Sequence, residues 1–326
     1  MKKIFITGGA GYVGAVLAPY LLKKGHAITI YDLMLYGEDV IPDQTNLTKV
    51  KGDIRDIKLL SESIRDHDIV IHLACISNDP SFELDPTLGK SINLDSFRPL
   101  VEVSKKNKIS RFIYASSSSV YGLKKEKDIT ESVSLSPMTD YSKFKAECEK
   151  ILFEYSDDKF TTVVIRPATV CGFSPRQRLD LVVNILTNLA FHKNEISVFG
   201  GNQLRPNIHI EDMVRAYETL INSPKEKVNK EIFNAGYENQ TVNKLAEIVK
   251  KVIGNNVEIK KVHSDDNRSY HISSKKISDK LGFKTVKNIE DAVKDLKTAF
   301  QKKLLKSPLD NEMYYNIKRM NNLKLK

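Results

Sequence analysis

A tyrosine and a lysine four residues apart form the pair with the clearest chemical potential in this sequence. Tyr141 and Lys145 lie near the start of a predicted helix over residues 140–154, where this spacing places two side chains on one face. A free tyrosine has a pKa of about 10 and is a poor base at neutral pH. Because a nearby lysine cation stabilises the phenolate, the pair predicts a base that removes a proton from a substrate hydroxyl.

Four consecutive serines precede this pair in the chain. They occupy positions 116–119 and directly follow a predicted strand over residues 111–115. A serine hydroxyl at the end of a neighbouring strand can hydrogen-bond the same substrate oxygen as the tyrosine. The tyrosine–lysine spacing alone is common and equally fits a solvated helix face, so its interpretation depends on the surrounding fold.

A glycine-rich turn follows the first predicted strand and opens a helix. Gly8, Gly11 and Gly14 give a tight turn, a close approach of backbone to a diphosphate, and close packing of helix on strand. Asp32 lies 18 residues after Gly14, near the spacing of about 20 residues expected for a carboxylate on the adenosine ribose. That carboxylate repels a 2′-phosphate, and no arginine adjoins it in the sequence. The segment therefore predicts a dinucleotide site that prefers NAD to NADP.

Short apolar runs alternate with helical patterns through the first half of the chain. Such runs are typical of strands buried on both faces of a parallel sheet, joined by right-handed crossovers. The sequence therefore predicts an α/β, Rossmann-like doubly wound parallel sheet. The expected strands are 3–7, 27–31, 49–52, 69–73, 111–115 and 161–166, and the expected helices are 11–24, 57–64, 95–106 and 140–154.

After about residue 166 the pattern becomes less regular. Helical stretches and short strand-like runs predict a smaller, mixed α/β lobe that binds substrate. We divide the chain into an NAD-binding domain, residues 1–166, and a mainly substrate-binding lobe, residues 167–326, interleaved through crossovers. The expected helices there are 180–191, 211–222, 242–253 and two short ones, and the expected strands are 196–199, 205–210, 232–235 and 257–262.

Taken together, these motifs resemble the extended short-chain dehydrogenase/reductases, which include epimerases, dehydratases and reductases of nucleotide sugars. The similar segments are 7–14, His72-Leu73-Ala74, 116–122 and 141–145. The resemblance implies Ser117 as the catalytic serine, with Ser118 as its near competitor, beside Tyr141 and Lys145. The cofactor-binding residues that it implies are Gly8, Gly11, Tyr12, Val13, Gly14, Asp32, Asp53, Ile54, Leu73, Ala74, Asn93, Tyr141, Lys145 and Pro167.

The resemblance implies a nucleoside-diphosphate sugar as the substrate. Many members carry Asn and Tyr where this chain has Thr169 and Cys171, so the sugar contacts differ from the usual pattern. Guanidinium groups suit diphosphates, and three segments with arginines resemble family positions that contact one. The resemblance implies substrate contacts at Ser118, Thr169, Arg178, Arg205 and Arg268.

One departure bears on the reaction. Dehydratases of the family place Asp-Glu directly after the catalytic residue, where this chain has Ser118 and Ser119. Elimination of water then lacks its usual acid and base. The sequence favours an NAD-dependent epimerase over a nucleotide-sugar 4-dehydrogenase or 4-reductase, and both over a dehydratase. A non-catalytic NAD(H)-binding protein is the alternative from another class.

Composition excludes several other classes. Hydrophobic residues make up 41% of the chain, and no run approaches the roughly 18–20 apolar residues of a membrane span. The basic terminus leads directly into the first strand, so we expect a cytoplasmic protein. The net charge of +10 comes from scattered lysines, which are typical of solvated faces and not of a nucleic-acid-binding stripe.

Cysteine and histidine positions predict no metal site. The three cysteines lack the spacing of a zinc site or a disulfide framework. His72 and His209 lie in apolar, strand-like runs and fit core or groove positions. The family resemblance further implies a homodimer, formed through the helices over residues 95–106 and 140–154.

Overall fold

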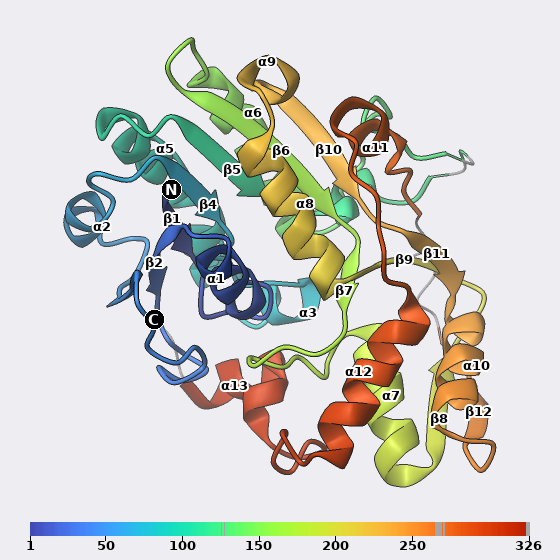
Figure 1. The fold of residues 1–326 in the computed structure, drawn as a ribbon. Helices are drawn as coiled ribbons and strands as arrows, with labels where there is room; N and C mark the ends of the chain where they lie inside the picture. Colours follow the sequence, from blue (N-terminus) through green and yellow to red (C-terminus); the bar gives the residue numbers. More distant parts are fainter. Residues whose placement is uncertain (125, 127, 265–268, 270, 324–326) are drawn as a thin grey trace.

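Seven parallel strands form the main sheet of the protein (Figure 1). The computed structural model describes residues 1–124, 126, 128–264, 269 and 271–323. The strand order is β10-β6-β5-β4-β1-β2-β3. The bounds are β1 (Lys3–Thr7), β2 (Ala27–Asp32), β3 (Leu47–Lys51), β4 (Ile69–His72), β5 (Arg111–Ala115), β6 (Thr161–Pro167) and β10 (Glu231–Ala235).

Helices cover both faces of this sheet, as the sequence predicted. Along β1, Ile4 and Ile6 join one buried cluster while Phe5 joins the other, because successive strand residues face opposite ways. The first face carries α1 (Gly14–Lys23) and α8 (Ile210–Asn222), and the second carries α2 (Ile57–Ser63), α5 (Phe97–Lys106) and α6 (Asp140–Glu154). The Rossmann-like doubly wound fold is therefore confirmed.

A second group of elements lies beside the carboxyl ends of these strands (Figure 1). One small sheet joins β7 (Thr169–Cys171), β9 (Leu204–His209) and β11 (Glu238–Thr241), and a parallel pair joins β8 (Glu195–Phe199) to β12 (Glu258–Val262). The helices α7 (Val182–Lys193), α10 (Val242–Ile253) and α12 (Ile289–Gln301) share a third buried cluster.

The main sheet takes residues from both halves of the chain. β10 pairs with β6, and α8 packs against α1, although both β10 and α8 follow residue 166. The main sheet therefore includes residues from both sides of the boundary that we placed at residue 166. The division into two domains stays a proposal. Remaining elements are α3 (Asp79–Phe82), α4 (Pro86–Lys90), η1 (Ser91–Asp95), η2 (Ser118–Tyr121), α9 (Lys225–Val228), α11 (Lys275–Leu281), η3 (Glu312–Tyr314) and α13 (Asn316–Leu323).

Several element ends differ from the sequence prediction for local reasons. α1 begins at Gly14 and not at Gly11, because residues 11–13 belong to the glycine turn. The predicted helix over 95–106 begins at Phe97, after a π-helical turn that ends at Asp95. Strands β7 and β11 were not predicted, since each has only three or four residues. Among the described residues, no helix has both the length and the apolar character of a membrane span.

A buried ion pair fastens α6 to the sheet. Arg166 donates from Nε to Glu149 Oε1 (2.9 Å) and from Nη2 to Glu149 Oε2 (2.5 Å), with both residues at most 3% exposed. Arg166 Nη1 also donates to the Tyr121 hydroxyl (2.8 Å), which donates to Asn234 of β10 (2.8 Å). Ser116 donates to the same Glu149 carboxylate. This network joins α6 to β6, to β10 and to the residue that follows β5, near the carboxyl end of the sheet.

We predict that Glu149→Ala lowers the free energy of unfolding by about 3–5 kcal/mol, because it leaves a buried guanidinium without its counter-charge. Glu147 on the same helix supplies the control, since it is exposed and pairs with Lys150 at the surface (3.2 Å). Glu147→Ala should change stability by no more than about 0.5 kcal/mol. Urea denaturation followed by circular dichroism measures both. Equal losses in the two variants would contradict the structural role given to the buried pair.

Candidate active site

A cavity of about 370 Å³ lies along the carboxyl ends of the parallel strands. This is the edge at which open α/β sheets bind their ligands. Its walls come from the glycine turn, the ends of β2, β4, β5 and β6, the start of α6, and α13. The predicted site residues that line it are Gly8, Gly11, Tyr12, Val13, Gly14, Asp32, Asp53, Ile54, Leu73, Ala74, Ser117, Ser118, Tyr141, Pro167, Thr169 and Arg178.

The glycine turn is packed so closely that side chains are excluded from it. A Cβ on Gly8, whose φ is +72°, would lie 2.5 Å from the Ala74 nitrogen, and one on Gly14 would lie 2.4 Å from the Gly9 oxygen. The first turn of α1 then meets the cavity with no side-chain cap at Val13. Uncapped amides at a helix N-terminus bind phosphate groups. The turn therefore fits the diphosphate of a dinucleotide.

Asp32 connects the end of β2 to the glycine turn. Its Oδ2 accepts from the Ala10 amide (3.0 Å), and its Oδ1 accepts from the Met34 amide (2.8 Å). Burial raises the pKa of Asp32, while these two amides and the positive charge of Arg176 act to lower it. The structure thus brings an arginine toward Asp32 from a distant segment, which the local sequence could not reveal.

Asn93 stands apart from the other predicted cofactor residues. It is buried and is not among the residues that line the cavity. Its Oδ1 accepts from the Ile76 amide (2.8 Å), and its Nδ2 donates to the Ile76 carbonyl (3.0 Å). Since Ile76 lines the cavity, Asn93 supports the wall behind it.

Tyr141 reaches the cavity from the first turn of α6. Burial raises its pKa above the ordinary value, and the charge of Asp79 acts in the same direction. The positive charge of Arg178 and a hydrogen bond with Ser117 act to lower that pKa. Ser117 and Ser118 both line the cavity beside Tyr141, and Ser117 Oγ lies 2.8 Å from Ser119 Oγ.

Lys145 lies one turn further along α6 and is 4% exposed. Its Nζ donates to the Ala115 carbonyl (2.7 Å) and lies 5.8 Å from the centroid of the Tyr141 ring and 5.0 Å from that of Tyr114. Lys145 is behind the tyrosine and not among the cavity-lining residues. A buried cation in this position favours the phenolate form of Tyr141.

Only some of the predicted substrate residues line the cavity. Thr169 and Arg178 line the cavity, with Arg178 donating to Asp180 (2.9 Å) and Ser77 (3.2 Å). Arg205, on β9, donates to the Leu204 carbonyl (3.0 Å) and is not among the lining residues. Arg268 lies outside the residues that the structure describes.

The cavity wall also contains residues that sequence reasoning missed, among them Arg176, Tyr36 and Asn316. Arg176 lies in the same basic segment as Arg178, so its charge was a visible signal, although only Arg178 was selected. Tyr36 follows β2, and Asn316 opens the C-terminal helix α13; both line the cavity. Neither belongs to a motif, because the fold alone brings these distant segments together.

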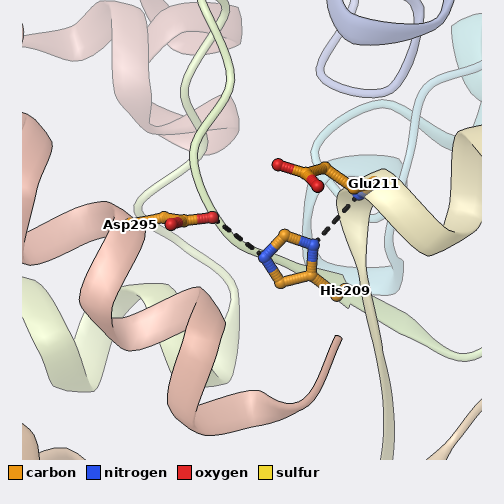
Figure 2. A group of neighbouring side chains, drawn as sticks. All are labelled: His209, Glu211 and Asp295. Carbon is orange, nitrogen blue, oxygen red and sulfur yellow. Dashed lines mark hydrogen bonds and ion pairs between the residues drawn. The ribbon is translucent and has the colours of Figure 1, made fainter. Parts of the chain in front are cut away.

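His72 and His209 are structural, as their apolar surroundings predicted. Burial lowers the pKa of His72 to about 3, and its Nδ1 lies 2.7 Å from the Thr7 hydroxyl. His209 caps α8 by accepting from the Glu211 amide at Nδ1 (3.1 Å), and its Nε2 lies 3.1 Å from Asp295 Oδ2 (Figure 2). Both nitrogens of His209 therefore contact protein groups, the Glu211 amide and the Asp295 carboxylate.

Comparison with known proteins identifies the class. The model of the NAD dependent epimerase/dehydratase family matches residues 4–236, so the chain belongs to this family. It is an NAD-dependent enzyme of the extended short-chain dehydrogenase/reductase type, and its cofactor is NAD. The close-packed glycine turn and the uncapped start of α1 agree with this assignment.

Individual relatives differ in their reactions. An uncharacterized UDP-glucose epimerase, YtcB of Bacillus subtilis, is 29% identical over 77% of this chain and 82% of its own length. A dTDP-glucose 4,6-dehydratase of Streptomyces niveus is 24% identical over 86% of this chain and 87% of its own. The crystal structure of a UDP-glucose 4-epimerase from Thermotoga maritima, with UDP-glucose, superposes with a TM-score of 0.85 at 24% identity, covering 93% of this chain and 100% of that one. This last likeness shows the fold.

We predict that the protein binds NAD more tightly than NADP, because the Asp32 carboxylate accepts from ribose hydroxyls and repels a 2′-phosphate. Asp32→Ser should narrow the difference between the two affinities by weakening NAD and relieving that repulsion. Calorimetric titration of both variants with both dinucleotides measures the ratio. Equal or tighter NADP binding by the unaltered protein would contradict the assignment of Asp32.

Proposed function

We propose that this protein is a nucleotide-sugar epimerase that inverts a sugar carbon, C4, through a transient keto sugar. The observation that carries the proposal is that Tyr141 and Ser117 line the cavity together with the glycine turn and Asp32, while the buried Lys145 lies directly behind the Tyr141 ring. A protein that merely bound NAD would have no need of a buried lysine beside a tyrosine that faces the cavity.

The residues divide the work as follows. Tyr141 removes the proton of the sugar hydroxyl, Ser117 hydrogen-bonds the same oxygen, and Lys145 stabilises the phenolate. Bound NAD supplies the chemistry of accepting a hydride and returning it. Tyr141 would return the proton to the sugar oxygen after the keto sugar has rotated to present its opposite face. The reaction would leave no net oxidation of the sugar, so NAD would be regenerated in each cycle.

The cavity wall argues against elimination of water. Ser118 and Ser119 line the cavity at the positions where the family's dehydratases place their acid pair. Where many family members have asparagine, Thr169 offers the sugar a hydroxyl on a shorter side chain. We therefore assign Ser118, Thr169 and Arg178 to the substrate. Arg205 and Arg268 stay proposed diphosphate contacts on the family resemblance alone. We further propose a cytoplasmic homodimer that uses α5 and α6, which pack side by side.

A panel of nucleotide sugars tests the proposed reaction. Each sugar is incubated with the purified protein, and the product and NADH are both measured. An epimerised sugar without net NADH supports the proposal. Stoichiometric NADH would instead identify a 4-dehydrogenase, loss of water a dehydratase, and absence of turnover across the panel a binding protein.

We predict that Tyr141→Phe lowers turnover by about 10²–10⁴, the range of general acid–base catalysis, while the fold and NAD affinity survive. Ser117→Ala should be milder, since it removes one hydrogen bond of about 1–3 kcal/mol. Ser118→Ala is the matched control for the neighbouring serine and should retain more activity than Ser117→Ala. Near-normal turnover of Tyr141→Phe would remove Tyr141 as the base.

The pH dependence of oxidation should follow the deprotonation of Tyr141. Because burial raises the pKa of Tyr141, kcat/KM should rise with pH through an alkaline limb. Lys145→Met removes a cation that stabilises the phenolate. The variant should therefore lose activity, and the alkaline limb of its pH–rate profile should move to higher pH. pH–rate profiles of both proteins measure this shift. An unmoved limb would show that Lys145 does not act on the tyrosine.

A further inference from the structure

Arg176 is a buried cation with unsatisfied donors at the wall of the cavity. The residue is 4% exposed, and its guanidinium carbon lies 3.4 Å from the centroid of the Tyr36 ring. Its Nη2 donates to Asn316 Oδ1 (2.6 Å), but its Nε and Nη1 have no hydrogen-bond partner among the described residues. Leaving such donors unpaired and buried is costly, so they are suited to an anion bound in the cavity.

The surroundings of Arg176 indicate which anion this is. The segment that carries it packs on the glycine turn: Ser174 donates to the Tyr12 carbonyl (2.8 Å), and the Tyr12 hydroxyl donates to the Gly172 carbonyl (2.7 Å). The charge of Arg176 acts on Asp32, whereas that of Arg178 acts on Tyr141. Arg176 therefore lies toward the adenosine ribose and beside the turn that holds phosphate.

We propose that Arg176 binds the diphosphate of NAD together with the glycine turn, and that Asn316 of the C-terminal helix positions its guanidinium. The inference rests on the dependence of the family on NAD and not on the identity of the sugar. A negative result for Arg176 would therefore not contradict the proposed epimerase reaction. A negative result for the epimerase reaction would likewise not contradict the role proposed for Arg176.

Asn316 is suited to this positioning role by its own contacts. It is 4% exposed, and its Oδ1 accepts from both Arg176 and the Tyr36 hydroxyl (3.0 Å). Its Nδ2 donates to Ser77 Oγ (3.0 Å), and its backbone N–H donates to Asp180 Oδ2 (3.0 Å).

The helix that follows Asn316 is anchored to the nucleotide-binding side of the protein. Arg319 Nε donates to the Leu35 carbonyl (2.8 Å), just after β2. Met320 lines the cavity together with Asn316. Figure 1 shows α13 between the end of α12 and the β2 side of the main sheet. The C-terminal helix thus closes the adenosine side of the cavity.

Binding of cofactor fragments to the full chain tests the role of Arg176. NAD, ADP-ribose and adenosine are titrated into the unaltered protein and into Arg176→Met, Arg176→Lys and the exposed control Arg65→Met. Loss of charge-assisted hydrogen bonds should weaken NAD and ADP-ribose by about 10-fold or more in Arg176→Met. Adenosine, which has no phosphate, should bind unchanged, Arg176→Lys should be intermediate, and Arg65→Met should match the unaltered protein.

A second pair of variants tests Asn316. Asn316→Ala should weaken NAD in the same direction by a smaller factor, again without affecting adenosine. Asn321→Ala, on the exposed side of the same helix, should leave both affinities unchanged. A purely structural asparagine would instead weaken NAD and adenosine alike.

Other outcomes would overturn the assignment. Unchanged NAD affinity in Arg176→Met, or equal loss of adenosine, would exclude a diphosphate contact. If Arg176→Met lost affinity for NADP alone, Arg176 would be assigned to a 2′-phosphate. Loss of UDP binding by the NAD-saturated protein, with NAD affinity retained, would assign it to the substrate. Should Arg176→Met fail to fold, Arg176→Lys and Asn316→Ala decide by the same comparison of NAD with adenosine.

Discussion

The hydrogen bond from Lys145 to the carbonyl of Ala115 (2.7 Å) couples α6, which carries the proposed base Tyr141, to the end of β5, which the four serines follow. A buried ammonium needs such an acceptor, and the last carbonyl of β5 supplies one. Because Tyr141 lies one helical turn before Lys145, the same contact sets where its ring meets Ser117. The reactive geometry therefore depends on how α6 is seated against β5.

The Glu149–Arg166 pair secures the same helix one turn further on. Glu149 follows Lys145 by four residues on the face that packs against the sheet, and it accepts from both Arg166 and Ser116. Ser116 adjoins Ser117, so one carboxylate supports the strand end and the helix together. The buried Glu149–Arg166 pair thus holds the proposed catalytic groups in place.

The fold could be predicted from sequence because its signals are local. The glycine turn, the apolar strands and the spacing of Tyr141 and Lys145 are each contained within a few residues. The parts of the site that depend on contacts between distant segments could not be predicted from the sequence. Arg176 and Asn316 meet only because α13 returns to the sheet, and β10 crosses the proposed boundary at residue 166 to pair with β6. Asn93 matches a family motif, yet it supports the Ile76 backbone and does not line the cavity.

The central claim is that a hydride leaves one face of the sugar and returns to the other without leaving the active site. The fate of a deuterium label at C4 of an accepted nucleotide sugar tests it most directly. The account predicts that the epimerised product, analysed by mass spectrometry and NMR, retains the label at C4 with none in the solvent and none in released NADH. Loss of the label to water would contradict hydride transfer and point to a proton-exchange mechanism.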